Sequence, residues 1–258
     1  MNEYNSRGYI PRESGGEIVS RTLDYGFSDF STALAFLSLL HNIEKKLPTE
    51  SPQFKEELLN NAKTLFRRAN NAYRALFDAS KGLMVPRGAN GDFSGRFSPI
   101  EWGNGYTEGN AWHHSFPAYS IICPFLNVNN DFFAAVKQKT PELNDVFDCK
   151  SGLMSLYARQ GDLLTKLHQL VTAQSRFQPG SYGQEIHEMT ESITLAMGQY
   201  AHNNQPVHHI LYLFAILGDY KTTQRLTREV INRGYGVDFF AGDEDNGEQG
   251  TSLNTLDR

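Results

Sequence analysis

Apolar residues recur every three or four positions along most of the chain. Between residues 21 and 41 the series consists of Leu23, Phe27, Phe30, Leu34, Leu37 and Leu40. A second series, from about residue 54 to residue 76, consists of Leu58, Ala62, Leu65, Ala69, Ala72 and Leu76. This spacing predicts two amphipathic helices, each with one buried stripe. Pro48 and Pro52 punctuate the connection between them, so the two helices are expected to form an up-down pair.

The same periodicity returns in the second half of the chain. A helix is predicted from residue 151 to 173, and the following segment, "EIHEMTESITLAMGQYAHNNQPVHH", is expected to begin as another helix. A third runs from Pro206 to Leu217, with proline in its first turn and Gly218 after its end, and a fourth from Tyr220 to Arg233. No segment alternates long enough to indicate a strand, and no internal repeat is found. The sequence therefore predicts an all-α fold of about seven helices joined by long loops.

The loops carry the unusual side chains. They cover residues 78–107, 177–186, 201–206 and 234–249. A loop as long as the first is usually functional or disordered, and its aromatic residues argue against disorder. Because all four loops adjoin helix ends, they are expected to converge at one end of the helical array and form a pocket there.

Composition excludes some classes of function. Of the 258 residues, 40% are hydrophobic and 21% charged, with a net charge of −5, so nucleic acid is not an expected partner. No apolar segment reaches the ~18 residues of a membrane span. The N-terminus has no apolar leader, so the chain is expected either to be cytoplasmic or to begin downstream of a leader. Aromatic residues make up 12%, which fits either a phenylalanine-rich core or a carbohydrate site.

Glu108 is the first candidate for chemistry. It lies in "GYTEGNAWHHSF", near Trp102, Tyr106, Trp112, His113 and His114. Hydrolysis of a glycosidic bond needs a carboxylic acid that protonates the departing oxygen. Packing against aromatic rings disfavours the ionised form of a carboxyl group. The alternative is that Glu108 caps a helix or pairs with a cation at its start.

The second candidate is the acidic segment "AGDEDNGEQG", residues 241–250. Its carboxylates repel one another, and a cation, a shared proton or a bound water would offset that cost; they are Asp243, Glu244, Asp245 and Glu248. The segment is a poor calcium loop of the EF-hand type, because the closing glutamate at the twelfth position is missing. A solvated acidic loop is the other alternative, against which the preceding Phe239 and Phe240 argue.

The third candidate is "AHNNQPVHH". Zinc is not favoured, because adjacent histidines on a helix point about 100° apart and rarely share one site. In "HEMTE", Glu191 occupies the place of the second histidine of a zinc protease motif. Asn203, Asn204 and Gln205 offer hard oxygen ligands, which suit calcium or sugar hydroxyls. The alternative for Asn204 is capping of the following helix.

Taken together, six segments resemble glycoside hydrolase family 92 and occur in the order of that family over nearly all of residues 8–250. They are "GYIPRESGGEIVSRTLDYGFSDF", "LMVPRGANGDFSGRFSPIEWG", "GYTEGNAWHHSFP", "EIHEMTESITLAMGQYAHNNQPVHHILYLF", "GDYKTTQRLTREVI" and "GDEDNGEQG". The resemblance implies a calcium-dependent exo-α-mannosidase that inverts the anomeric centre. It also implies an N-terminal β-sandwich followed by an (α/α)6 toroid.

The resemblance implies a role for each matched position. Glu108 matches the general acid, and Asp243 and Asp245 match the acidic pair that supplies the general base, with Asp245 as the expected base. Asn204 and Gln205 match the calcium-binding motif, although many members carry a carboxylate where this chain has Gln205. The expected substrate-binding residues are Trp102, Trp112, His187 and Glu188.

The predicted organisation is a partial (α/α)6 toroid over residues 1–250 and a divergent tail over residues 251–258. The β-sandwich and the first toroid helices are not in this sequence, so the chain reads as a fragment of a catalytic domain. Two functions remain open. One is an inverting exo-α-mannosidase acting on α-linked mannose of N-glycans or mannans, incomplete as this chain. The other is a catalytically inactive, calcium-dependent glycan-binding or interaction fragment.

Overall fold

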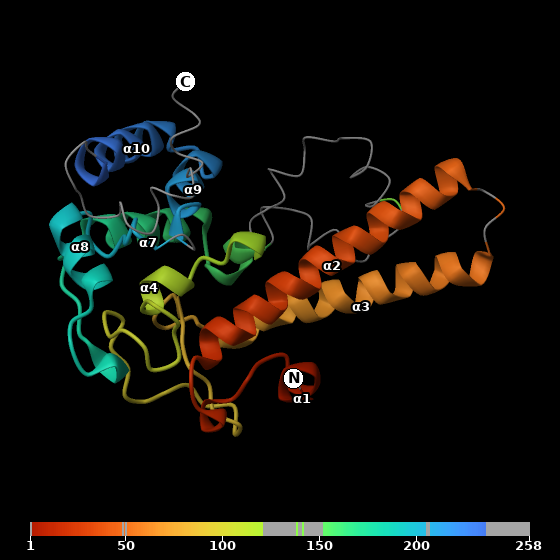
Figure 1. Cartoon of the computed structure of the whole chain (residues 1–258), viewed down its shortest axis with the longest axis horizontal. Helices are drawn as coiled ribbons and strands as arrows, with labels where there is room; N and C mark the ends of the chain where they lie inside the picture. The colour runs from red at the N-terminus through yellow and green to blue at the C-terminus, as the bar shows by residue number, and fades with distance from the viewer. Residues whose placement is uncertain are drawn as a thin grey trace.

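A computed structural model describes residues 2–47, 49, 51–120, 138, 141, 152–204 and 207–235. Two long antiparallel helices extend from a body of shorter helices and loops (Figure 1). The described residues form eight α-helices and one pair of two-residue strands, which confirms the predicted all-α class. No helix among the described residues is long and apolar enough to span a membrane.

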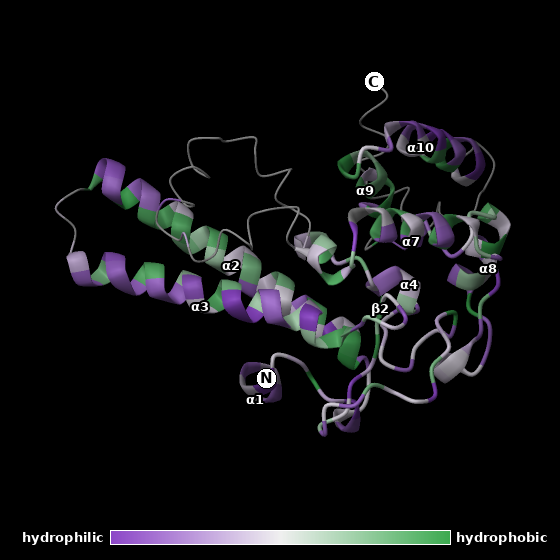
Figure 2. Cartoon of the chain, turned by 180° about the vertical axis from the view of Figure 1, so that it is seen from behind, coloured by the Kyte–Doolittle hydropathy of each residue, from purple (hydrophilic) through white to green (hydrophobic). Residues whose placement is uncertain are grey.

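The long pair consists of α2 (Ile18–Lys46) and α3 (Pro52–Leu76). Hydrophobic and hydrophilic segments alternate along both helices, as the sequence pattern predicts (Figure 2). The phenyl rings of Phe30 and Phe66 meet edge to face between them, with centroids 5.5 Å apart. The predicted stripe is wrong at Phe27, which is 50% exposed, because Gly26 takes the inward position. Phe66, and not Leu65, is fully buried on α3.

A partly buried ion pair joins α2 and α3. The guanidinium of Arg68 donates to both oxygens of Asp29, at 2.8 and 2.5 Å. The hydroxyl of Tyr4, from α1 (Asn2–Arg7), donates to the same carboxylate at 3.0 Å. The pair therefore joins α1, α2 and α3 at one point.

A short hairpin follows α3. Strand β1 (Phe77–Asp78) pairs antiparallel with β2 (Leu83–Met84), with Phe77 opposite Met84. Isolated bridges join Arg87 to Phe93 and residue 101 to residue 178. The sequence pattern missed these strands because two residues are too few for alternation to be recognised. The segment 78–103 is thus a folded loop that leads the chain to the candidate site.

The body contains α4 (Ala111–His114), α7 (Gln160–Thr172), α8 (His187–Leu195), α9 (Ile210–Ile216) and α10 (Tyr220–Gly234). Single 3₁₀ turns lie at Arg12–Ser14, Ala118–Ser120, Leu153–Leu156 and Gly180–Tyr182. Two predicted starts are wrong. The helix expected from residue 151 begins at Gln160, after a 3₁₀ turn, and the helix expected from Pro206 begins at Ile210.

One hydrophobic core runs from the α2–α3 hairpin into the body. It contains Phe30 and Leu76 from the hairpin, Phe116 after α4, and Leu167 and Phe214 from the body helices. Figure 1 shows α4 between the base of the hairpin and the group formed by α7, α9 and α10. Loops from both halves of the chain therefore meet around α4.

Candidate active site

Glu108 lies on the loop that precedes α4, and its side chain is exposed. Its backbone has φ 44°, in the left-handed region that residues other than glycine rarely adopt. Its N–H donates to the hydroxyl of Tyr182 at 2.9 Å, and its carbonyl accepts from Nδ2 of Asn204 at 2.5 Å. Both backbone groups of Glu108 are thus held by side chains distant in sequence, which maintains an otherwise unfavourable conformation.

The hydroxyl of Tyr182 accepts from the backbone of Glu108 and feels the charge of nearby acidic side chains. Loss of solvation raises the pKa of its phenol, and the negative charges of Glu108, Glu17 and Glu188 add to this effect, while the hydrogen bond from Glu108 opposes it. The phenol therefore remains protonated well above neutral pH. Three acidic side chains from separate segments lie close enough to one hydroxyl to act on it.

Asn203 and Asn204 connect this cluster to α8. The amide of Asn203 donates to the carbonyl of Glu188 at 3.1 Å and to the carboxylate of Glu191 at 2.7 Å. The side chain of Asn204 donates through Nδ2 to the carbonyl of Glu108, and Oδ1 is its remaining polar atom. The structure thus brings Glu108, Glu188 and Asn204 together. Asn204 is not the cap of the following helix, because α9 begins after His209.

His187 and Glu188 begin α8. The Nε2 atom of His187 lies 3.4 Å from the carboxylate of Glu188, and the histidine side chain is 57% exposed. The second oxygen of Glu188, Oε2, is buried and has no hydrogen-bond partner among the described residues. A buried carboxylate oxygen without a partner is unusual in proteins and indicates that another group belongs there.

The donor set fits a hard cation. Oδ1 of Asn204 and Oε2 of Glu188 are an amide oxygen and a carboxylate oxygen, which are the ligand types that calcium prefers. No group of three or more histidine, cysteine, aspartate or glutamate side chains with metal-binding geometry occurs in the described part of the chain.

The expectation for the two tryptophans is not met. Trp102 is fully buried, with its ring 5.2 Å from that of His113 and 5.6 Å from that of Phe177. Trp112 is 8% exposed, and Nζ of Lys166 covers its ring at 4.5 Å. Both rings belong to the core: Trp112, on α4, lies in the main cluster, and Trp102 packs with Phe177 and Met189. Within the described residues they neither enclose the carboxyl of Glu108 nor offer a face to a sugar.

Two buried histidines support the loop from below. Loss of solvation lowers the pKa of His113 to about 3 and that of His114 to about 4. The Nε2 atom of His113 bonds to the carbonyl of Gln199 at 2.9 Å, and the side chain of Gln199 accepts from Asn110 at 3.0 Å. No sequence pattern indicates the contacts made by Gln199 and Tyr182, since single polar residues far from Glu108 carry no periodicity or motif.

His202 and His208 form a structural pair. Their rings stack with centroids 4.4 Å apart. The two ring nitrogens of His202 bond to the hydroxyls of Tyr200 and Tyr235, each at 2.9 Å. Because both nitrogens of His202 are occupied, this pair is part of a buried hydrogen-bond network and does not bind zinc through His202.

A pocket of about 690 Å³ lies beside Tyr182, which is one of its lining residues. It lies between the start of α2, the loop around residues 94–106 and the 3₁₀ turn at 180–182, and its polar lining includes Arg12, Glu17, Arg96, Glu101 and Tyr182.

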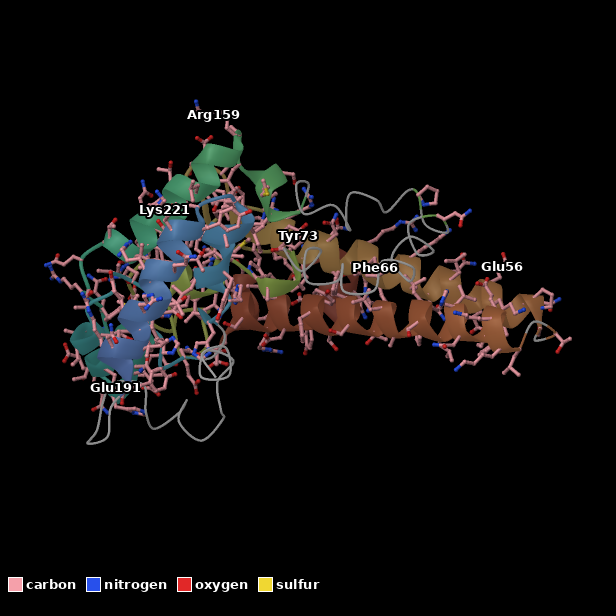
Figure 3. The ribbon with its side chains drawn as sticks, turned by 90° about the horizontal axis from the view of Figure 1, so that it is seen from above. Glu56, Phe66, Tyr73, Arg159, Glu191 and Lys221 are labelled. Atoms are coloured by element: carbon pink, nitrogen blue, oxygen red, sulfur yellow. The ribbon has the colours of Figure 1, made fainter. Side chains whose placement is uncertain are left out.

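Glu191, near the candidate site, lies at the opposite end of the molecule from Glu56 on the α2–α3 hairpin (Figure 3). Gln205, Asp243, Asp245 and the tail 251–258 lie outside the described residues.

Known proteins share this fold. The chain resembles a family 92 inverting mannosidase from Bacteroides thetaiotaomicron VPI-5482, with a TM-score of 0.62 and 29% identity over 98% of this chain and 28% of that one. A family 92 α-mannosidase from Bacteroides thetaiotaomicron gives a TM-score of 0.61 and 22% identity over 99% of this chain and 26% of that one. The same enzyme with bound mannoimidazole gives a TM-score of 0.62 and 22% identity over 99% of this chain and 27% of that one.

The chain therefore spans about a quarter of the length of these solved structures. No curated protein matches it. The sequence profile of the glycosyl hydrolase family 92 catalytic domain matches residues 1–120 and 143–253, which is most of the chain. On this evidence the chain belongs to glycosyl hydrolase family 92.

Proposed function

We propose that the protein carrying this chain is an inverting exo-α-mannosidase that acts on α-linked mannose of N-glycans or mannans. The observation that carries the proposal is the setting of Glu108. Its carboxylate is exposed to solvent, while its backbone is fixed by Tyr182 and Asn204. A fixed backbone beneath an accessible carboxyl group is what proton transfer to a bound substrate requires.

In the proposed reaction, Glu108 protonates the oxygen that leaves with the remainder of the glycan. Asp245 removes a proton from water on the other side of the sugar ring, and Asp243 helps to hold that water. Inversion requires the two carboxyl groups to lie ~6.5–9.5 Å apart, so that the water fits between acid and base. The two residues come from different loops, so a gap of this size is easily formed.

Asn204 and Gln205 are the proposed calcium ligands, with His187 and Glu188 beside the mannose or the metal. Oδ1 of Asn204 and the unpartnered oxygen of Glu188 support this assignment. When bound, calcium supplies a hard cation for the vicinal hydroxyls of mannose, which favours distortion of the ring. Asn204 would serve two purposes, because its Nδ2 also holds the carbonyl of Glu108.

The test is release of mannose from an α-1,2-linked mannobiose by the protein. We expect turnover with calcium, loss of turnover with a chelator, and a loss of about 10²–10⁴-fold in Glu108→Gln, the range that general acid catalysis contributes. Glu56→Gln removes an equal charge at the far end of the hairpin and should change nothing. Turnover that persists in Glu108→Gln would reject the assignment. Calcium-dependent binding of mannoside without turnover would favour a glycan-binding role instead.

A further inference from the structure

We propose that Ser20 and His114 are positioning residues, which hold the loop that carries Glu108 through a closed ring of hydrogen bonds around Thr107. The inference rests on the proposed function, because it assigns these residues to placement of the proposed acid. Neither residue has a role in the reaction proposed above.

Three contacts form the ring. The N–H of Thr107 donates to Oγ of Ser20 at 2.8 Å. Oγ of Ser20 lies 3.2 Å from Nδ1 of His114, and Nε2 of His114 lies 2.8 Å from the carbonyl oxygen of Thr107. Both backbone groups of the residue before Glu108 are therefore bound, and the two side chains that bind them also bind each other.

The donors and acceptors match in one way only. A carbonyl oxygen can only accept, so Nε2 of His114 carries the proton. In a neutral imidazole Nδ1 is then an acceptor, and the hydroxyl of Ser20 must donate to it. The lone pairs of that hydroxyl remain to accept the N–H of Thr107. Loss of solvation lowers the pKa of His114 to about 4, so its imidazole is neutral near neutral pH, as this hydrogen-bond pattern requires.

The ring connects the loop to a rigid element. Ser20 lies in the first turn of α2, where the N–H groups of Val19 and Ser20 donate to the carbonyl of Gly105 at 2.8 and 3.3 Å. The ring of His114 packs 5.7 Å from that of Tyr106. Helix α2 thus fixes residues 105–107, while Tyr182 and Asn204 hold Glu108 itself. Without this ring of hydrogen bonds, rotation at Thr107 would carry the carboxyl group of Glu108 away from the oxygen that it protonates.

The experiment compares two leaving groups. The variants Ser20→Ala and His114→Phe are assayed with mannobiose and with 2,4-dinitrophenyl α-mannoside, and kcat and KM are measured for each. Dinitrophenolate leaves without protonation, so misplacement of the acid matters little for it. We expect kcat for mannobiose to fall by about 10-fold or more, part of the general acid contribution. We expect kcat for the dinitrophenyl substrate and both KM values to stay near those of the wild type.

Three further variants make the result decisive. Thr22→Val removes a hydroxyl from the next turn of α2, where it accepts the N–H of Ile10 at 3.0 Å, and should not distinguish the leaving groups. His114→Gln keeps a donor for the carbonyl of Thr107 and should recover part of the loss. Glu108→Gln is the reference for a lost acid.

Each outcome has one meaning. If Glu108→Gln distinguishes the leaving groups and Ser20→Ala does not, the positioning role is wrong and the proposed function stands. If Glu108→Gln does not distinguish them, the proposed function itself fails. A loss in Ser20→Ala that is equal for both substrates also overturns the inference. If His114→Phe does not fold, Ser20→Ala decides alone, because it removes only a hydroxyl.

Discussion

At the scale of single residues, the main feature is the backbone of Glu108. A side chain in the left-handed region costs about 1–2 kcal/mol relative to glycine. Only Asn104, Glu108 and Ala196 among the described non-glycine residues have positive φ. Ala196 ends α8, where the left-handed conformation is common, and Asn104 belongs to a residue type that tolerates it. Glu108 has neither explanation, which agrees with a carboxylate kept there for its chemistry.

This conformation predicts an unusual response to mutation. Glu108→Gly should raise the free energy of unfolding by about 1 kcal/mol relative to Glu108→Ala, because glycine adopts φ 44° without strain. Ala35→Gly, on the exposed side of α2, should lower it by about 1 kcal/mol. Urea denaturation of the variants measures both effects. Equal stability of Glu108→Gly and Glu108→Ala would contradict the backbone geometry described for this loop.

Residue-level prediction from sequence identified residues that the structure brings together, and the roles assigned to them stay predictions. Glu108, Glu188 and Asn204 were singled out from their motifs, and the structure brings them together. It failed for Trp102 and Trp112, because composition does not reveal whether a ring near a carboxylate faces a ligand or the core. Tyr182 was missed because its contribution depends on contact with a residue 74 positions away.

At the scale of elements, the hairpin of α2 and α3 depends on one glycine. A Cβ at Gly26 would overlap the hydroxyl of Tyr119 and lie 3.0 Å from Cβ of Ala72. Tyr119 cannot move aside easily, since it is 4% exposed and packs against the rings of Phe30 and Tyr73. Gly26 therefore allows the two helices and the segment after α4 to pack together.

Gly26→Ala should therefore destabilise the chain, although alanine favours a helix. The gain in helix propensity is about 1 kcal/mol, and overpacking of a core costs about 1–3 kcal/mol. Gly161→Ala in α7 is the matched control, because a Cβ there meets nothing within 4 Å, and it should be neutral or stabilising. Thermal unfolding distinguishes the two. A higher Tm for Gly26→Ala than for the parent would show that this packing is wrong.

The elements also show where periodicity is informative. The long helices were predicted because a stripe of 20 or more residues outweighs local exceptions such as Phe27. The strands β1 and β2 and the short helix α4 were not, because two to four residues show no period. The candidate site lies mostly on these short elements and loops, so its shape depended on tertiary contacts that the pattern does not encode.

At the scale of the whole molecule, several histidines are buried in the neutral state. The pKa is about 3 for His113 and His202 and about 4 for His114, in each case mainly through loss of solvation. An unfolded chain binds these protons near pH 6.5. Folding therefore excludes protons that the unfolded chain takes up, and stability is complete only above that pH.

Acid should therefore unfold the protein early. As pH falls from 7 to 5, each of the three histidines should lower the free energy of unfolding by about 2 kcal/mol. Urea denaturation at several pH values measures the slope. His113→Gln should reduce the slope, because it removes one of the buried rings. An unfolding free energy that is equal at pH 7 and pH 5 would contradict the burial of these rings.

An experimental structure of the protein with a mannoside analogue that is not hydrolysed would test the role of Glu108 directly. We predict that the carboxyl group of Glu108 lies within hydrogen-bond distance of the glycosidic oxygen. We also predict that the carboxyl group of Asp243 or Asp245 lies ~6.5–9.5 Å from the carboxyl group of Glu108, on the opposite side of the sugar. A substrate bound away from Glu108, or an acidic segment 241–250 at the other end of the helices, would contradict the account.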